Sequence, residues 1–336
     1  MNVLGIETSC DETSAAVVRD GTVLSNVISS QLVHARYGGV VPELASRAHQ
    51  RLIIEVVDRA LADAGLARSD LHGIAATQGP GLVGALLVGL SFGKAMAYGL
   101  RIPFLGVNHM EGHLYSGFLT CDQPGFPFVC LIVSGGHTML ILVEEPFVHR
   151  LLGQTRDDAA GEAFDKVAKM LGLGYPGGPA IDRTASEGDP AAIDFPRAYL
   201  ERASFDFSFS GIKTAVLYSL RHRALPAGEQ LDHRHVADVC ASFQAAVLDV
   251  LIDKTMRAAR ACAVRDITVG GGVSANSELR RRMQEEAGRE GKRVFFPPPE
   301  YCMDNGAMIA YVGWMRLMRG ETSPLSLEAV ANLDVG

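Results

Sequence analysis

Two histidines four residues apart, His109 and His113, have the clearest chemical spacing in this sequence. Residues four apart on a helix project from the same face, so their imidazole rings can bind one divalent metal ion. A pair of partly buried core histidines is the alternative, and the spacing alone leaves both interpretations open. The pair directly follows a predicted strand, residues 104–107, where α/β proteins place ligand-binding groups, and this position favours the metal.

Glu111 lies between these histidines and invites comparison with the H-E-x-x-H metalloproteases, whose general base directly follows the first histidine. Here the glutamate comes one position later. On a helix that shift turns the side chain by about 100°, to roughly 200° from His109, so Glu111 is predicted to point away from the metal. The pattern therefore disfavours peptide hydrolysis.

Three turns rich in glycine, serine or threonine each follow a predicted strand, at residues 7–13, 134–138 and 270–276. Glycine lets backbone N–H groups close around a phosphate, and hydroxyl side chains add donors, so such turns can bind nucleotides. Ordinary turn formation explains any one of them taken alone. The sequence has neither a G-x-x-x-x-G-K-[ST] motif nor G-x-G-x-x-G after the first strand, which leaves P-loop and dinucleotide-binding interpretations unsupported.

The elements around these turns repeat. Similar strand–turn–strand units occupy residues 3–18 and 128–143, and each is followed by alternating helices and strands. This weak repeat predicts an α/β protein of two related lobes. In the second half, Asp165 lies at the edge of the apolar stripe of a predicted helix, residues 159–171, where it could face a ligand.

Two predicted helix starts carry further polar groups. Gly178 and Pro179 are typical of a helix with proline at its first position, and Asp182 follows one turn later. Asp304 precedes the last predicted helix, where aspartate is a common N-cap, and it would be a ligand only if a partner lay elsewhere in the fold.

Composition limits the classes of function. A length of 336 residues suggests roughly two domains. The net charge of −7 argues against binding nucleic acid or membrane by charge alone, so an RNA contact would need a local patch such as residues 221–223 or 280–282. Six scattered cysteines without a C-x-x-C pair indicate reduced thiols. Glycine and proline interrupt the uncharged stretches 73–93 and 123–143, and no basic leader is seen, so we expect a cytoplasmic protein without membrane association.

In combination, the motifs resemble those of one family over nearly the whole chain. This is the TsaD family, the bacterial tRNA N6-adenosine threonylcarbamoyltransferases, formerly called O-sialoglycoprotein endopeptidases. The motifs that carry the resemblance are GIETSCDET (5–13), HARYGGVVPELASRAH (34–49), HMEGH (109–113), VSGGHT (133–138), GEAFDK (161–166), YPGGP (175–179), FSGIKT (209–214), GGVSAN (271–276) and DNGA (304–307).

The resemblance implies a fold and a reaction. The fold is α/β, of the actin-like ATPase (ASKHA) type, with two related lobes and a central cleft; we expect lobes of residues 1–108 and 109–336. The reaction moves a threonylcarbamoyl group from threonylcarbamoyl-AMP to N6 of the adenosine just 3′ of the anticodon, in tRNAs reading codons that begin with A. The products are N6-threonylcarbamoyladenosine and AMP, so the protein would be a metal-dependent acyltransferase.

Site residues carry over from the family by position. His109, His113 and Asp304 would hold one divalent metal ion, with iron(II) expected and zinc or manganese also compatible with two histidines and a carboxylate. Asp11 and Glu12 would have a catalytic role near the attacking amine. The expected binding residues for the donor are Ile132, Val133, Ser134, Gly135, Gly136, Asp165, Gly178, Asp182 and Asn276.

The expected partners are tRNA, a paralogous actin-like subunit (TsaB) and a small ATPase (TsaE), while a separate synthase supplies the adenylate. The predicted helix 46–66 would dock the paralogue. Two other functions stay open from the residues alone. One is a metalloprotease, and the other is a non-catalytic ATP-binding scaffold whose nucleotide binding would not need His109 or His113.

Overall fold

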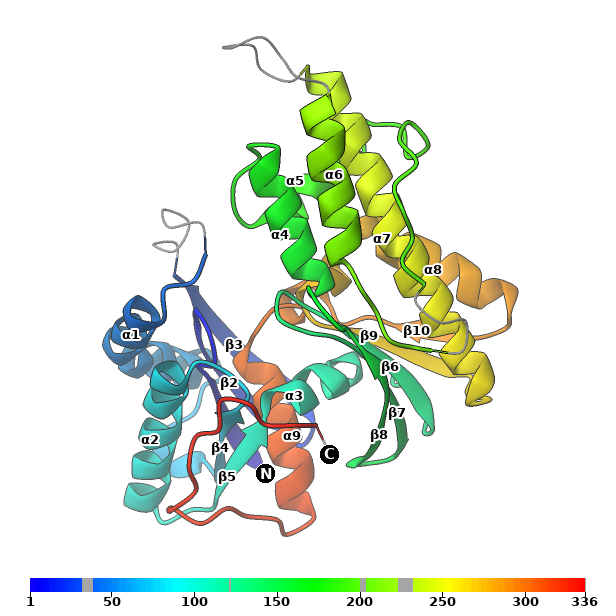
Figure 1. Cartoon of the computed structure of the whole chain (residues 1–336). Coiled ribbons are helices and arrows are strands. Elements are labelled where there is room, and N and C mark those ends of the chain that lie inside the picture. Colours follow the sequence, from blue (N-terminus) through cyan, green and yellow to red (C-terminus); the bar gives the residue numbers. More distant parts are fainter. Residues whose placement is uncertain (32–38, 121, 200–203, 223–231, 336) are drawn as a thin grey trace. The chain divides into compact units, whose positions relative to one another are not determined.

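The structure, a computed structural model, describes residues 1–31, 39–120, 122–199, 204–222 and 232–335. The chain forms two compact units, Met1–Gln123 with Pro297–Val335, and Pro124–Phe296 (Figure 1). This division differs from the expected boundary at residue 108. Helix α3 (His109–Tyr115) packs against helix α9 (Gly306–Met318), and α9 packs against the first strand, so both helices belong to the first unit.

The first unit contains a five-stranded mixed sheet of order β3-β2-β1-β4-β5. Its first three strands run antiparallel in sequence, and β4 and β5 continue the sheet parallel to β1. Because β1, β4 and β5 are parallel, their carboxyl ends lie at the same edge. The strands are β1 (Asn2–Glu7), β2 (Glu12–Arg19), β3 (Thr22–Ser30), β4 (Gly73–Gly79) and β5 (Phe104–Asn108).

The second unit repeats this plan. Its sheet has the order β10-β9-β6-β7-β8, with β6, β7 and β8 antiparallel and β9 and β10 parallel to β6. Two sheets with the same order and directions confirm the predicted duplication. The edge strand β8 was not predicted, because most of its side chains are exposed and show no clear alternation. The strands are β6 (Phe128–Val133), β7 (Thr138–Glu145), β8 (Val148–Gln154), β9 (Asp266–Gly270) and β10 (Arg293–Phe295).

Helices cover both faces of the first sheet. Helices α1 (Pro42–Asp63) and α2 (Val83–Leu100) pack on one face, and α3 and α9 lie on the other (Figure 1). Helix α1 begins at Pro42, four residues before the predicted start, because proline is tolerated in the first turn of a helix. Part of the sequence motif that leads into α1, residues 34–38, lies outside the described residues.

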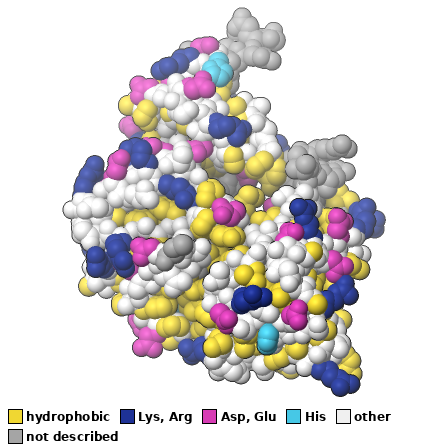
Figure 2. All heavy atoms as spheres, turned by 180° about the vertical axis from the view of Figure 1, so that it is seen from behind, with side chains coloured by type: hydrophobic (Ala, Val, Ile, Leu, Met, Phe, Trp, Pro, Cys, Tyr) yellow, Lys and Arg dark blue, Asp and Glu magenta, His cyan; other side chains and the backbone are white. Residues whose placement is uncertain are grey.

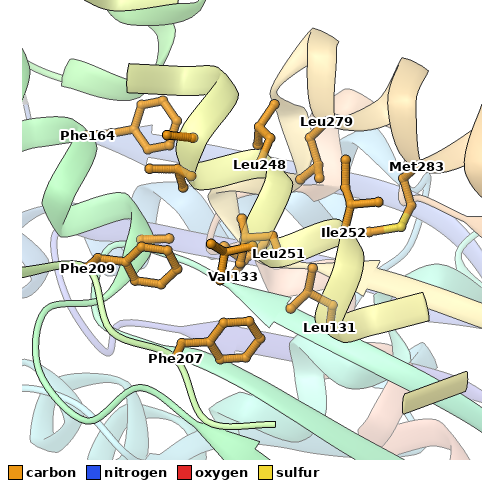
Figure 3. Close-up of a cluster of buried hydrophobic side chains, with 14 of the residues drawn as sticks. Leu131, Val133, Phe164, Phe207, Phe209, Leu248, Leu251, Ile252, Leu279 and Met283 are labelled. Carbon is orange, nitrogen blue, oxygen red and sulfur yellow. The ribbon is translucent and has the colours of Figure 1, made fainter. Parts of the chain in front are cut away.

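The core of the second unit forms where its helices meet the sheet. Figure 3 shows Leu131 and Val133 of β6 together with Phe164 of α4 and Leu251 of α7, and all four side chains are fully buried. Burial of such side chains supplies most of the driving force for folding. The helices of this unit are α4 (Ala160–Met170), α5 (Gly177–Ala185), α6 (Ser210–His222), α7 (His233–Ala261) and α8 (Ser277–Arg289).

Among the described residues, two helices, α2 and α7, are long and apolar enough to cross a membrane by length and composition alone. Core helices pass the same test, and 78% of the α7 window is buried, against 33% for α2. The two uncharged stretches noted in the sequence become strand β4 with the start of α2, and the β6–β7 hairpin. The described cysteines are free thiols. Short 3₁₀ turns occupy Arg68–Asp70, Ser116–Phe118, Gly272–Ala275 and Pro299–Tyr301.

Candidate functional site

His109, His113 and Asp304 come together in the first unit, although Asp304 is far away in the sequence. The Nε2 atoms of His109 and His113 lie 3.4 and 3.0 Å from Oδ1 of Asp304. The two imidazole rings are nearly perpendicular, with their centroids 4.7 Å apart. Both histidines are buried, whereas the side chain of Asp304 retains 24% of its exposure, so the group is reachable from one side.

Two helix caps explain why His109 and Asp304 can face one another as ligands. Asn108, at the end of β5, caps α3 by accepting a hydrogen bond from Met110 N at 2.8 Å, which starts the helix at His109. At α9 the predicted cap is wrong: Asn305, not Asp304, accepts from Met308 N at 3.0 Å. Because Asn305 satisfies the helix terminus, the carboxylate of Asp304 can face the histidines.

The donor set fits a divalent cation. Two ligands bonded at about 2.1 Å with tetrahedral or octahedral angles lie about 3.0–3.4 Å apart. The distances from each Nε2 to Asp304 Oδ1 fall in that range, and the three ligand atoms lie within 4.8 Å of one another. Two imidazoles and one carboxylate leave coordination positions open for substrate or water, as in catalytic rather than structural metal sites.

The electrostatics around His109, His113 and Asp304 also favour binding of a cation. Burial alone would lower the pKa of His109, but the negative charges of Asp304 and Glu7 outweigh it and raise that pKa well above its usual value. Burial would raise the pKa of Asp304, yet the two histidines hold it well below the ordinary range. The carboxylates of Asp304 and Glu7 therefore stabilise a positive charge at this site.

Glu12 and Asp11 belong to the same negative region. Burial, followed by the charges of Asp304 and Asp11, raises the pKa of Glu12 to about 9. The charges of both Asp304 and Asp11 thus act on the carboxyl group of Glu12. Since a bound metal ion is often the largest charge in a site, it would favour the ionised form of Glu12.

Glu7 at the end of β1 and His49 of α1 are functional candidates that the sequence patterns did not single out. The side chain of Glu7 is fully buried and contacts His109 Nδ1 at 2.9 Å. His49 holds the turn between β1 and β2, with Nδ1 2.8 Å from Thr13 Oγ1 and Nε2 3.0 Å from the carbonyl oxygen of Cys10. A carboxylate that ends an otherwise apolar strand was the available signal for Glu7, because charges are almost never fully buried without partners.

Glu111 is placed as its position on the helix predicts. Its carboxylate binds Arg316 of α9 at 2.7 Å (Oε1 to Nη2) and 3.2 Å (Oε2 to Nε). Arg316 also pairs with Glu321. With its oxygens engaged by this ion pair, Glu111 is not available as the general base that a metalloprotease would need beside the histidines.

The glycine-rich turn of the second unit, residues 134–137, connects β6 to β7. Ser134 N donates to the carbonyl of His137 at 2.8 Å, and His137 N donates to Ser134 Oγ at 3.1 Å. Ile132 and Val133 are fully buried in β6, so they can reach a ligand only through their backbone. Gly135 and Gly136 are exposed, and a Cβ added to either would have no neighbouring atom within 4 Å. The turn is therefore closed by its own hydrogen bonds and open above its glycines.

Asp165 contacts the first residue of α5, Gly177, which directly precedes Gly178. Asp165 Oδ1 accepts a hydrogen bond from Gly177 N at 2.7 Å, and a Cβ on Gly177 would lie 2.6 Å from the Cα of Asp165. Helix α5 begins at Gly177, so Pro179 is its third residue and the prediction of proline at the first position is wrong. Pro176 precedes the helix instead and supplies the extended N-cap.

Asp182 and Asn276 each bind groups at the start of α8 or beside it. Asp182 accepts hydrogen bonds from the backbone and hydroxyl of Ser277, both at 3.0 Å. Asn276 caps α8 through Leu279 N at 2.8 Å and donates to Gln244 Oε1 of α7 at 2.8 Å. Asp182, Gln244 and Ser277 also line an open pocket of about 200 Å³, a volume that accommodates only part of a nucleotide.

The short basic clusters do not form a free patch where they are described. Arg281 pairs with Glu278 and Glu285, Arg282 pairs with Asp249, and Arg280 stacks on Phe296 at 4.8 Å. Arg223 of the other cluster lies outside the described residues. On the face seen in Figure 2, the Lys and Arg side chains are interspersed with Asp and Glu. This face therefore offers no extended basic surface among the described residues.

The family profile and the similar proteins found by sequence comparison all carry the same description. The sequence profile of TsaD, described as tRNA N6-adenosine threonylcarbamoyltransferase, matches residues 22–311. A protein of that name from Salinibacter ruber is 58% identical over 336 residues, covering 100% of both chains. Another from Moorella thermoacetica is 54% identical and covers 99% of this chain and 96% of the relative.

Solved structures of low sequence identity share the fold. HypF from T. kodakarensis has a TM-score of 0.63 at 14% identity, over 95% of this chain and 48% of HypF. The activator of the 2-hydroxyisocaproyl-CoA dehydratase from Clostridium difficile, solved with bound ADPNP, has a TM-score of 0.52 at 12% identity, over 96% and 99% of the two chains. These neighbours have actin-like ATPase folds, which confirms the predicted fold class.

Proposed function

The chain belongs to the tRNA N6-adenosine threonylcarbamoyltransferase family, and we propose that it transfers a threonylcarbamoyl group to N6 of a tRNA adenosine. The donor would be threonylcarbamoyl-AMP and the acceptor the adenosine just 3′ of the anticodon. This acceptor base lies in a single-stranded loop, where proteins can reach base edges without opening a duplex. Because tRNA is the acceptor, the reaction would take place in the cytoplasm.

The single observation that carries this proposal is the group of His109, His113 and Asp304, whose ligand atoms lie within 4.8 Å of one another. We propose that these residues hold one divalent ion, with iron(II) favoured and zinc or manganese compatible. Such an ion supplies neutralisation of negative charge on phosphate or carbonyl oxygens. The protein contributes a rigid helix start, a carboxylate freed by Asn305, and a site open on one side.

Asp11 and Glu12 are proposed to serve the acceptor. The exocyclic amine of adenine is a poor nucleophile, so placing it against an activated mixed anhydride is the main catalytic task. When ionised, Glu12 can accept a proton from the amine as the new bond forms.

The second unit is proposed to bind the donor adenylate. The open turn at Ser134–Gly136 presents backbone and hydroxyl donors suited to a phosphate. Asp182, close to Gly178 on helix α5, and Asn276 at the start of α8 would bind the remainder of the nucleotide. Asp165 would act by holding the start of α5, which places Gly178, rather than by touching the ligand itself.

Partners are proposed to supply what the isolated chain lacks. The net charge of −7 and the paired arginines of α8 give weak electrostatic attraction for tRNA. A paralogous actin-like subunit and a small ATPase would complete the activity, with the adenylate made by a separate synthase. Exposed apolar side chains on α1 and α2, Ile54, Val83 and Leu87, are the proposed docking surface for the paralogue.

The proposal is tested by removing the metal. The chain is treated with a chelator, reloaded with iron(II), zinc or manganese in turn, and assayed with partners, threonylcarbamoyl-AMP and unmodified tRNA. We expect transfer to disappear with the metal and to return with at least one of the three. Transfer that persists in chelator-treated protein would contradict the assignment, and cleavage of a glycoprotein by the reloaded chain would favour the metalloprotease instead.

A further inference from the structure

We propose that Glu7 is a positioning residue for the histidine–aspartate group, acting through His109. The inference rests on the proposed metal site, and it concerns how that site is held rather than which residues bind the ion. Glu7 ends β1 and its side chain is fully buried. Its Oε2 atom lies 2.9 Å from His109 Nδ1, on the side of the imidazole opposite to Asp304.

The sheet itself brings Glu7 to this place. Strands β1 and β4 are parallel, and the register pairs Ile6 with Ala76, so Glu7 and Thr77 follow at the same level. Helix α3 begins directly after β5, the next strand along the same edge, and its first residue is His109. Three neighbouring strand ends therefore deliver the carboxylate, a hydroxyl and the imidazole to one buried point.

Each oxygen of Glu7 has a donor. Ser9 N donates to Oε1, and Thr77 Oγ1 donates to Oε2 at 2.6 Å, alongside His109 Nδ1. An ionised carboxylate only accepts hydrogen bonds, so His109 must carry its proton on Nδ1 to complete this arrangement. Ser9 Oγ lies 3.2 Å from the same Nδ1 atom, a longer contact than that of Glu7.

The consequence concerns the other ring nitrogen. With the proton fixed on Nδ1, neutral His109 presents the lone pair of Nε2 toward Asp304, which is the form a metal ligand requires. The negative charge of Glu7 also makes the imidazole a better donor to a cation. Carboxylates in this relation to a ligating histidine typically change metal affinity by roughly 10- to 100-fold when they are mutated.

The second histidine has no matching support. Nδ1 of His113 has no hydrogen-bond partner among the described residues, although the atom is buried. The two histidines therefore differ: His109 is oriented by a charged partner, and His113 by its place on α3 and its contact with Asp304. Of the two histidines, a change at Glu7 should therefore affect His109 more than His113.

The test measures metal affinity in the full chain by competition with a chelator, using zinc alone, and records the visible spectrum of the cobalt(II) form. Glu7→Gln keeps the size of the side chain and removes its charge, and we expect zinc to bind roughly 10- to 100-fold more weakly with an altered cobalt spectrum. Glu7→Asp, which keeps the charge, should recover part of the affinity. Glu7→Gln that is folded, as judged by circular dichroism, and binds zinc like the wild type would overturn the inference.

Two control variants test whether the effect on zinc depends on the charge of Glu7 and on its contact with His109. Glu111→Gln removes another buried carboxylate from the same region, but one that binds Arg316, so zinc affinity should stay within about threefold of the wild type. Thr77→Val removes one hydrogen bond to Glu7 and keeps the charge, so its effect on zinc should be smaller than that of Glu7→Gln. An equal loss of affinity in all three variants would also overturn the inference, because it would reflect general destabilisation.

A measurement on the wild type covers the case in which Glu7→Gln does not fold. In the zinc-loaded chain labelled with ¹⁵N-histidine, nuclear magnetic resonance identifies which ring nitrogen of His109 carries hydrogen. We expect hydrogen on Nδ1, and hydrogen on Nε2 would contradict the role of Glu7. If the wild type binds no zinc, cobalt or iron at all, the metal proposal itself fails, whereas normal binding by a folded Glu7→Gln refutes only the positioning role.

Discussion

Gly161, the second residue of α4, packs directly against the backbone of Ser134. Its N–H donates to the Ser134 carbonyl at 3.1 Å, and a Cβ at this position would lie 2.6 Å from that oxygen. Gly271, at a φ of +90°, makes a similar approach to the Val133 carbonyl, with a Cβ distance of 2.5 Å. Two glycines thus bring helix α4 and the turn after β9 against the end of β6.

Substitutions at Gly161, which is closely packed, and at Gly136, which is not, should differ in their effect on stability. Gly161→Ala should destabilise the protein by about 1–3 kcal/mol, because backbone atoms must move to admit the methyl group. Gly136→Ala should change stability by less than about 0.5 kcal/mol, since nothing lies near its Cβ position. Urea unfolding of both variants checks this pair, and equal stabilities would show that the close packing of α4 on the turn is wrong.

Gly136→Val tests the proposed phosphate contact at the same turn. The space around Gly136 allows the larger side chain in the free protein, so the loss should fall on donor binding rather than on stability. We expect at least a tenfold weaker affinity for a non-hydrolysable adenylate analogue in calorimetry, with near-normal unfolding. Unchanged affinity would remove this turn from the donor site.

The duplicated fold and the positions of the two histidines could be predicted from the sequence because they depend on local patterns. The apolar runs of β1 and β6, each with a turn and a return strand, indicated the duplication, and the helical spacing of His109 and His113 indicated one shared face. The direction of Glu111 followed from the same helical geometry and is confirmed by its ion pair with Arg316.

The remaining parts depend on long-range pairing that no local pattern contains. Glu7 reaches His109 only because β1, β4 and β5 are neighbours in register, and Asp304 reaches His113 across 191 positions. The compact units also divide elsewhere than the expected boundary at residue 108, because the packing of α9 on the first sheet returns residues 297–335 to the first unit. Caps also depend on a choice between adjacent residues, as at Asp304 and Asn305.

The two histidines should respond differently to alanine. His113→Ala is expected to abolish tight metal binding with little loss of fold, because two remaining ligands cannot keep the geometry. His109→Ala should lose the metal and also destabilise the protein by about 1.5–3 kcal/mol, since it removes one of the hydrogen-bond donors to the buried carboxylate of Glu7. Metal analysis and thermal unfolding measure both effects; stoichiometric metal in the double variant would sink the assignment.

His49 should matter for activity without binding metal. Its ring joins α1 to Thr13 and Cys10, on either side of the proposed catalytic residues Asp11 and Glu12. His49→Ala is therefore expected to lower the transfer rate at least tenfold while zinc affinity stays near that of the wild type. Zinc titration and a transfer assay on the same preparation separate the two, and a normal transfer rate would show that this contact is dispensable.

Asp266 gives a prediction for pH. It binds Arg293 through both oxygens, at 2.9 and 2.6 Å, and accepts from Gly125 N at 2.7 Å. Burial opposes ionisation, but these hydrogen bonds and the Arg293 charge hold the pKa of Asp266 below its ordinary value of 3.8. Because the native pKa is lowered, its stabilisation is present above about pH 4 and is lost as the pH falls through the native pKa.

Asp266→Asn removes this contribution. At pH 7 the variant should be less stable by about 1.5–3 kcal/mol, the usual range for hydrogen bonds to a charged group. The difference from the wild type should shrink as the pH is lowered below 4. Denaturant unfolding at pH 7 and in this acid range measures it, and a difference that grows toward acid would contradict the sign.

The isolated chain is expected to depend on its partners for efficient transfer. With the paired arginines of α8 and a net charge of −7, the isolated chain should bind tRNA weakly at physiological salt. We expect little or no multiple turnover from the chain alone and a large gain when the paralogous subunit and the small ATPase are added. Full multiple turnover by the isolated chain would refute this dependence.

The most direct test of the central claim is the product itself. The metal-loaded chain, its partners, threonylcarbamoyl-AMP and unmodified tRNA are incubated, and the nucleosides of the digested tRNA are separated and identified by mass spectrometry. The account predicts N6-threonylcarbamoyladenosine in equal amount to released AMP, and none of it with His113→Ala. Unmodified adenosine from the wild type, or equal product from His113→Ala, would contradict it.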